Sequence, residues 1–156
     1  MLRRDREITD MNEMLEVLDS CEVIRIGMFD EDGGIYVLPM NFGYTYEEGV
    51  LTFYLHAALD GKKIDLLRKC GRVGFELDCG HQLVEGKLPC QYGYRYASII
   101  GSGEAQIVED PKEKTEAMAV LMKCMTGKDF EFNERLVSIV SVIKITAESF
   151  CGKKRE

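Results

Sequence analysis

Two lysines stand where a helix is predicted to begin, and no other feature of the sequence points so directly to chemistry. The segment 54–63 runs from the end of a predicted strand into a predicted helix at 61–69, which Asp60 would cap. A helix start carries partial positive charge and free N–H groups, so a cation there costs about 0.5 kcal/mol. A bound anion would meet the lysines and the N–H groups together. Lys62 and Lys63 therefore indicate a site for a phosphate-bearing ligand, the alternative being that both lysines simply face water.

Histidine and cysteine offer few further candidates. His56 lies beside the predicted anion site, where an imidazole can donate a proton or help to hold the phosphate. His81 follows Cys79, and together with Cys90 it offers three possible zinc ligands in one loop. Their spacing matches no common zinc module and no fourth ligand is evident, so we expect no metal site. A zinc-stabilised loop remains an alternative hypothesis.

Composition excludes several classes of protein. The net charge is −7, and nucleic-acid binding depends on Lys and Arg neutralising phosphates, so we expect no nucleic-acid partner. The first ten residues have no apolar signal core, and no apolar run is long enough to span a membrane. We therefore expect a cytoplasmic protein whose six cysteines are mostly buried thiols. Neither the glycine-rich dinucleotide fingerprint nor the P-loop motif is present.

Short apolar runs separated by turns predict hairpins. Six strands are expected, at 23–28, 35–42, 50–55, 72–77, 94–108 and 136–145, with a long loop at 78–92. Helices are expected at 10–20, 61–69 and 111–126, with capping boxes at Asp10–Glu13 and Asp110–Glu113. Gly101 and Gly103 indicate a bend within the fifth strand. This pattern predicts one mainly β (α+β) domain over residues 1–156, a six-stranded antiparallel barrel with flanking helices, and flexible ends at 1–8 and 153–156.

The order and spacing of several segments resemble a known family. Ile35 to Asn41, Val50 to His56, Gly61 to Leu67 and Arg72 to Phe75 together resemble the pyridoxamine 5′-phosphate oxidase-like FMN-binding split barrel. The resemblance covers roughly residues 5–153. Within that superfamily the chain looks closest to the 5-nitroimidazole resistance (Nim-type) proteins, through segments 53–58 and 90–98 and the ending near Gly152 and Lys153.

The resemblance implies a homodimer with an FMN at each of two sites on the subunit interface. Lys62 and Lys63 match the basic phosphate contacts of the family. Segment 55–58, that is Leu55, His56, Ala57 and Ala58, would lie beside the flavin and its ribityl chain. Pro39, Met40 and Asn41 match the strand that runs along the isoalloxazine ring, and Ser98 would also reach the cofactor.

The activity implied by the resemblance is that of an FMN-dependent oxidoreductase acting on a small acceptor such as a nitroaromatic. His56 aligns with the histidine that Nim-type proteins place at the flavin, and it is the candidate catalytic residue. Two alternatives stay open, namely a flavin-binding module without turnover and an enzyme related to the oxidases themselves. The second is disfavoured because Tyr36 stands where the oxidases have an arginine, and because the arginine-rich motifs near their C-terminus are missing.

Overall fold

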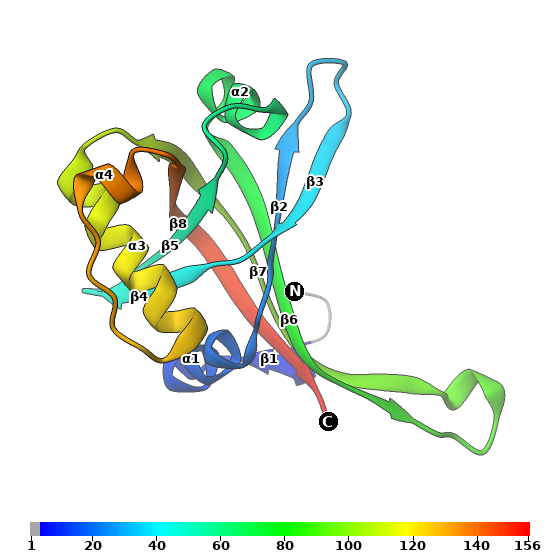
Figure 1. Cartoon of the computed structure of the whole chain (residues 1–156). Coiled ribbons are helices and arrows are strands. Elements are labelled where there is room, and N and C mark those ends of the chain that lie inside the picture. The colour runs from blue at the N-terminus through cyan, green and yellow to red at the C-terminus, as the bar shows by residue number, and fades with distance from the viewer. Residues whose placement is uncertain (1–3) are drawn as a thin grey trace.

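Long antiparallel strands dominate the computed structural model, which describes residues 4–156 (Figure 1). The strands are β1 (Glu7–Ile8), β2 (Ile24–Phe29), β3 (Ile35–Met40), β4 (Gly43–Glu47), β5 (Val50–Ala57), β6 (Arg72–Val84), β7 (Gly93–Val108) and β8 (Ser141–Arg155). They form one sheet in the order β3-β2-β6-β7-β8-β5-β4, with β1 paired to β8. Strands β3 and β4 end this path without pairing to each other, so the sheet is an open, split barrel.

The helices are α1 (Met11–Ser20), α2 (Lys62–Lys69), α3 (Pro111–Thr126) and the single turn α4 (Glu134–Val137). Two short 3-10 segments, η1 (Arg4–Arg6) and η2 (Pro89–Gln91), complete the described chain. None of the helices in residues 4–156 combines the length and the apolar composition that crossing a membrane requires. The mainly β fold class with flanking helices is confirmed, although the described part of the sheet has eight strands where we expected six.

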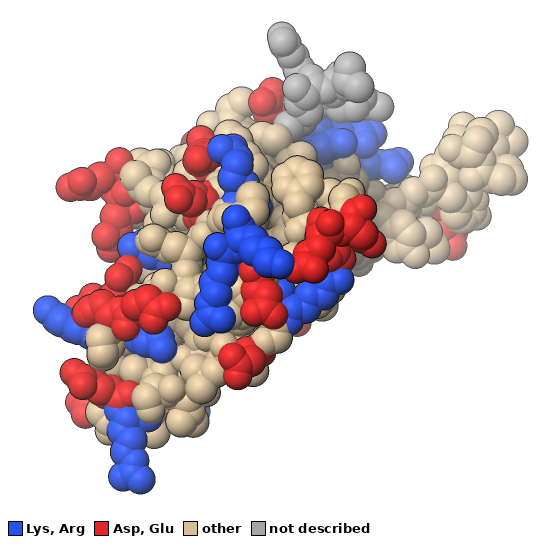
Figure 2. Space-filling model, turned by 90° about the horizontal axis from the view of Figure 1, so that it is seen from above, with Lys and Arg blue, Asp and Glu red and all other residues tan. Residues whose placement is uncertain are grey.

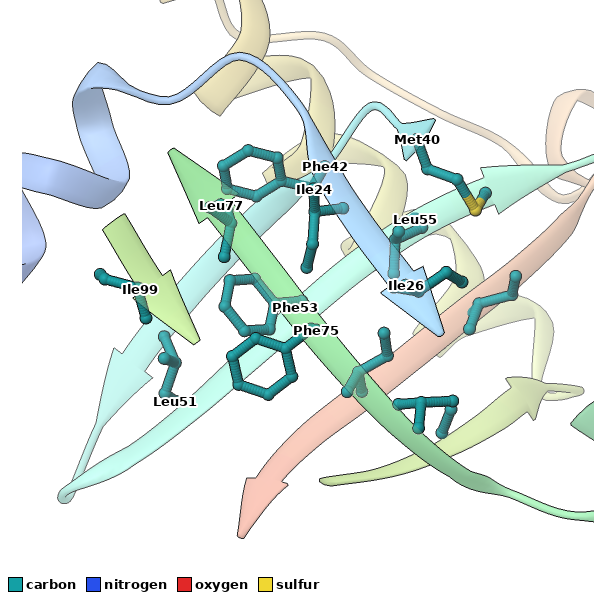
Figure 3. Close-up of a cluster of buried hydrophobic side chains, with 14 of the residues drawn as sticks. Ile24, Ile26, Met40, Phe42, Leu51, Phe53, Leu55, Phe75, Leu77 and Ile99 are labelled. Carbon is teal, nitrogen blue, oxygen red and sulfur yellow. The ribbon is translucent and has the colours of Figure 1, made fainter. Parts of the chain in front are cut away.

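Alternating apolar residues of the strands fill the centre of the split barrel. Phe53 is fully buried, and its ring makes edge-on contacts with Phe42 at 5.9 Å and with Phe75 at 5.0 Å between centroids (Figure 3). A second, smaller cluster lies where α3 and α4 cover the far ends of β7 and β8: Val108, Ala117, Met118, Val137 and Val142. The strands are therefore held by packing on two sides.

The predicted capping boxes form only in part. Asp10 does cap α1, accepting hydrogen bonds from the backbone N–H groups of Asn12 at 2.7 Å and Glu13 at 3.3 Å. The Glu13 carboxylate does not return to the cap, because it pairs with Lys154 of β8. At α3 the Asp110 side chain caps nothing, and Glu113 pairs instead with Lys144 at 2.8 Å. Charge-assisted bonds to lysines of β8 have replaced the reciprocal bonds.

The expected loop at 78–92 is wrong for residues 78–84, which continue β6, whereas residues 85–92 do connect the two strands. Strand β6 continues to Val84 and β7 begins at Gly93, and these segments pair as a lone ribbon that we call the β6–β7 arm (residues 79–96). The neighbouring strands end near the base of the arm: β2 pairs with β6 only as far as Leu77, and β8 pairs with β7 only as far as Tyr96. The arm therefore projects from the body (Figure 1). Neither side of the arm packs against a core, so the alternation of apolar and polar residues that predicts a strand is weak there.

The C-terminal segment also differs from expectation. Residues 134–137 form α4, and the last strand runs from Ser141 to Arg155 rather than from 136 to 145. Its end pairs with β7 and β1, so the supposed flexible end at 153–156 lies largely within the sheet. At the other end Ile8 is fully buried, whereas residues 1–3 lie outside the described chain. The predicted bend in β7 is confirmed, as the pairing with β8 shifts register between Ser102 and Gly103.

Candidate functional site

The beginning of α2 meets the turn between β2 and β3, which are distant from it in sequence. The Lys62 ammonium lies 2.5 Å from the Asp30 carboxylate and 4.8 Å above the centre of the Tyr36 ring. At the other end of the helix Lys69 pairs with Glu31. Figure 2, which looks down on this end of the molecule, shows basic and acidic side chains interleaved rather than segregated. The acidic turn therefore neutralises part of the positive charge that the sequence places on α2.

The two lysines at the helix start have different surroundings. The hydrogen bond to Asp30 raises the pKa of Lys62, and the same bond lowers the pKa of Asp30. Lys63 is partly buried, and it forms no ion pair with any residue in 4–156. Of the two predicted phosphate contacts, Lys63 is thus the one whose charge is still available to an external anion.

The backbone at the helix start is open to a ligand. The N-cap position belongs to Gly61, not to the expected Asp60, and no side chain caps this end. Its φ of 132° favours glycine, because residues with a Cβ rarely adopt such a conformation. The Gly61 carbonyl accepts from Ile64 at 2.9 Å and Asp65 at 3.2 Å. The N–H groups of Lys62 and Lys63 therefore have no acceptor within the helix.

Strand β5 separates the predicted flavin-side residues into two sets. Leu55 and Ala57 are buried in the core, so only their backbone can face a ligand. His56 and Ala58 are exposed, and the His56 imidazole makes no hydrogen bond or ion pair in the described chain. His56 pairs in register with Val142 of β8. The exposed imidazole is thus near the start of α2 in sequence and free of any group that would orient it.

The end of β3 offers a second group of predicted residues. The Met40 side chain is buried, whereas Pro39 and Asn41 are exposed. Asn41 lines a cavity of about 380 Å³ together with Asp19 and Tyr44. The Tyr44 hydroxyl donates to Asp19 at 2.6 Å, and burial together with this carboxylate raises the pKa of Tyr44. Lys62 stands over Tyr36, at the opposite end of β3, so the two groups could share only an elongated ligand.

Ser98 does not join the other predicted residues within one chain. The sheet register runs from His56 to Val142 and on to Val108, whereas Ser98 lies at the far end of β7 from Val108. Ten residue steps of extended strand separate Ser98 from Val108, roughly 30 Å. A single bound molecule cannot contact both Ser98 and His56 unless they come from different copies of the chain.

The possible zinc ligands are also dispersed. His81 pairs with Asp78 at 3.0 Å near the base of the arm, and Arg25 binds the same carboxylate at 2.6 Å. Cys90 lies in η2, beyond the paired strands of the arm. In the part of the chain that the structure describes, no three His, Cys, Asp or Glu side chains gather as metal ligands do. The zinc-stabilised loop therefore has no geometric support.

One side of the sheet is unusually apolar for a surface. Four large apolar side chains are 52–63% exposed on β2, β3 and β7: Phe29, Ile35, Val37 and Ile100. Phe29 pairs with Ile35, and Val37 pairs with Gly27, so these side chains are neighbours on one side of the β2–β3 hairpin. Ile100 faces the same side, but Arg25 and Glu76 lie between it and β3. We call this surface the outer apolar face. Contiguous exposed apolar residues usually mark an interaction surface.

The protein is thus an open antiparallel barrel that has an uncapped helix start with two lysines and an apolar outer surface. A family model described as pyridoxamine 5′-phosphate oxidase matches residues 10–154. The chain therefore belongs to the pyridoxamine 5′-phosphate oxidase family, as the sequence resemblance indicated. None of the curated proteins compared with the chain matches it significantly.

Solved structures show the same fold. A candidate 5-nitroimidazole antibiotic resistance protein from Bacteroides thetaiotaomicron VPI-5482 is 30% identical, with a TM-score of 0.81 over 95% of this chain and 86% of that one. An FAD and heme binding protein from Mycobacterium smegmatis has a TM-score of 0.83 at 13% identity, over 97% of this chain and 74% of that one. An FAD-binding protein from Mesorhizobium loti has a TM-score of 0.64 at 23% identity, over 97% and 98%. The last two likenesses establish the fold alone.

Sequence reasoning missed Asp30 as a neighbour of Lys62. The acidic run at 30–32 is visible in the sequence, and it indicated a turn. Its opposite charge to the lysines at 62 and 63 was the available signal that the two segments meet. Pairing across 32 residues, however, needs the sheet to fold first.

Proposed function

We propose that this protein is a flavoprotein that binds FMN, with the phosphate held at the start of α2. The observation that carries the proposal is the uncapped helix start, where the N–H groups of Lys62 and Lys63 lack acceptors and the Lys63 ammonium has no carboxylate partner in residues 4–156. A dianion there would satisfy both backbone donors and the lysine. This donor set fits a phosphate, and membership of the family together with flavin-binding proteins of the same fold supports a flavin as its bearer.

We propose FMN rather than FAD because one phosphate is what this helix start can hold. The flavin would extend from α2 past the exposed His56 and Ala58, and Pro39 and Asn41 would contact its ring system. Leu55, Ala57 and Met40 would contribute backbone, since their side chains belong to the core. Such a surface covers only one side of a flat ring, so water would reach the other side in a single chain.

A homodimer would supply the missing wall. The outer apolar face is the kind of surface that a second copy would cover, and a symmetric pair would cover both faces at once. The separation of Ser98 from His56 along β7 also favours two copies, because Ser98 of one protomer could then approach the site of the other. We propose a homodimer with one FMN at each of two interface sites.

The proposed reaction is reduction of a small acceptor, with a nitroaromatic suggested by the likeness to the candidate 5-nitroimidazole resistance protein. The flavin, when bound, supplies the hydride and electron transfer. His56 would hold or donate a proton at its exposed imidazole nitrogen. The net charge of −7 favours a small-molecule substrate over nucleic acid, and we propose a cytoplasmic protein.

One observation favours the alternative of a flavin-binding module without turnover. General acids are commonly fixed by a second hydrogen bond, and the His56 imidazole has none in the described chain. The two functions make different predictions for the same sample: an enzyme's bound flavin bleaches on addition of a reduced pyridine dinucleotide and recovers with acceptor, whereas a carrier's flavin stays oxidised.

The proposal is tested by the absorbance spectrum of the freshly purified protein and by titration of the flavin-free protein with FMN, FAD and riboflavin. We expect the yellow flavin bands, and affinity in the order FMN, then FAD, then riboflavin, which lacks a phosphate. A colourless protein that shows no fluorescence quenching or thermal shift with any of the three would overturn it.

A further inference from the structure

A second concentration of positive charge lies where β1, β7 and β8 meet, far along β7 from the start of α2. It consists of Arg6 in η1, Arg95 on β7 and Lys153, Lys154 and Arg155 on β8, and we call it the basic cluster. The register of β7 and β8 pairs Tyr96 with Arg155 and Ser98 with Lys153. These paired residues therefore lie on one side of the sheet.

Only part of this charge is compensated by ion pairs within the described residues, although Glu7 of β1 lies opposite Lys153 in the strand register. Lys154 pairs with Glu13 and Glu156, and Arg6 lies 3.9 Å from Asp5. No carboxylate in residues 4–156 forms an ion pair with Arg95, Lys153 or Arg155. The chain has more carboxylates than cations, with a net charge of −7, yet these three cations have no carboxylate partner among the described residues. Like charges on neighbouring strands repel one another, and an external anion would relieve that repulsion.

Tyr96 stands among these cations. Its ring centre is 5.9 Å from the Lys153 ammonium. Hydrogen bonds from Lys153 and then from Arg6 lower the pKa of Tyr96, so the phenol oxygen is drawn toward two positive groups. The arrangement combines an aromatic ring, a polar oxygen and the cations Lys153 and Arg155 on one side of the sheet. Arg95 and Lys154 alternate to the other side, so the basic cluster wraps around the strand ends.

The cluster surrounds hollows in the surface. One cavity of about 520 Å³ is lined by Gly80, Arg95, Tyr96 and Arg155 together with Ala97, Lys154 and Glu156. A second cavity of about 330 Å³ brings in Arg6 and shares Lys154, Arg155 and Glu156 with the first, so the two adjoin. The size of these cavities suits a small organic ligand rather than a single ion.

We propose that the basic cluster binds the phosphate groups of a pyridine dinucleotide, which would be the electron donor of the oxidoreductase proposed above. This inference rests on that proposed function, because it names the reductant of the same flavin. Roughly 30 Å of β7 separates Ser98 from the strand end beside His56, so the cluster is a second anion site and cannot serve the phosphate at α2 of the same chain. Ser98, the residue implied at the partner's flavin, adjoins the cluster through Lys153. Arg guanidinium groups suit the pyrophosphate, and the Tyr96 hydroxyl can donate a further hydrogen bond to it while the ring packs against a planar base.

The test is calorimetric titration of the flavin-loaded protein with NADP⁺, with NAD⁺ and with inorganic pyrophosphate. The double variant Lys153→Gln with Arg155→Gln is expected to bind the dinucleotides at least tenfold more weakly, and Tyr96→Phe about threefold more weakly. The control Lys112→Gln with Lys128→Gln removes two exposed lysines near the two ends of α3 and is expected to stay within twofold of wild type. Pyrophosphate should compete with the dinucleotides for the wild-type protein.

Titration of each flavin-free variant with FMN separates the failure of this inference from failure of the proposed function. Dinucleotide affinity unchanged in the double variant and in Tyr96→Phe overturns the inference. Loss of FMN binding in the double variant, with FMN retained after Lys63→Gln, also overturns it, because the cluster would then hold the flavin phosphate. Cluster-dependent dinucleotide binding in a protein that binds no flavin would support the binding site and overturn the proposed function. Because Tyr96→Phe keeps the ring, it serves if the double variant unfolds.

Discussion

At the scale of single residues, the adjacent lysines 62 and 63 illustrate how surroundings decide chemistry. Both carry one positive charge on the first turn of the same helix. Lys62 reaches the Asp30 carboxylate and the Tyr36 ring, whereas Lys63 has no such partner in the described chain. An ion pair that already exists contributes little further attraction to an incoming anion. The capacity to hold phosphate therefore lies mainly with Lys63 and with the free N–H groups.

This difference leads to a prediction for FMN affinity. Replacing Lys63 by Gln removes an unpaired cation, and we expect the dissociation constant of FMN to rise about tenfold, corresponding to about 1.4 kcal/mol. The matched control is Asp30→Asn with Lys62→Gln, which removes the ion pair without changing the net charge and should alter the constant less than about threefold. Quenching of flavin fluorescence measures both. The reverse order of effects would contradict the assignment.

At the scale of elements, two ion pairs tie α2 to the turn between β2 and β3. Lys62 binds Asp30 and Lys69 binds Glu31, so both ends of the helix are fastened to one hairpin. Lys62, Lys69 and Glu31 are exposed and Asp30 is partly buried, so each pair alone contributes little in water. Their common effect is to set the position of the helix start relative to β3, where other predicted site residues lie.

The lowered pKa of Asp30 predicts a dependence of stability on pH. Its bond to Lys62 holds the pKa below the ordinary value of 3.8, so the folded protein releases this proton more readily than the unfolded chain. The contribution of the pair to stability is complete above that value and is lost as the pH falls through the lower, folded-state pKa. We expect the difference in thermal midpoint between wild type and Asp30→Asn to shrink toward zero below pH 3.8. A difference that stays constant into strong acid would exclude an electrostatic origin.

The bend in β7 predicts a site that tolerates no side chain. A Cβ at Gly101 would lie 2.4 Å from both the Phe75 ring and the Ser149 carbonyl oxygen. We expect Gly101→Ala to lower the free energy of unfolding by about 1–3 kcal/mol, because the strands must move apart to admit the methyl group. At Gly74 the added Cβ would only touch the Gly101 carbonyl at 3.9 Å, so Gly74→Ala serves as the control. Urea unfolding, followed by circular dichroism, compares the two variants.

At the scale of the whole molecule, the outer apolar face predicts self-association. Val37 is 60% exposed on this face, so a charge there would have to be buried without a partner in the proposed dimer. We expect Val37→Asp to convert the proposed dimer to a monomer in size-exclusion chromatography with light scattering. Ile139 is 70% exposed beyond α4, and Ile139→Asp should leave the dimer intact. A wild-type protein that is monomeric at all concentrations would refute the proposed interface.

Local patterns were sufficient for much of the fold. Alternating apolar residues in segments 23–28 and 50–55 predicted β2 and β5, and Asp10 predicted the beginning of α1. These features depend on neighbours within a few residues, so a sequence carries them directly. The same patterns failed in the β6–β7 arm, because exposed strands that pair only with each other show no core-facing alternation.

The sequence by itself determined the mainly β class, the family, and the presence of two lysines at a helix start. Only the tertiary structure decided that Asp30 forms an ion pair with Lys62. It also decided that residues 153–155 lie at the end of a strand beside Tyr96, and that Ser98 lies far from His56. The physical reason is the range of the interactions. Turns, caps and periodicity act along the chain, whereas ion pairs and strand register join segments that approach only after the sheet has formed.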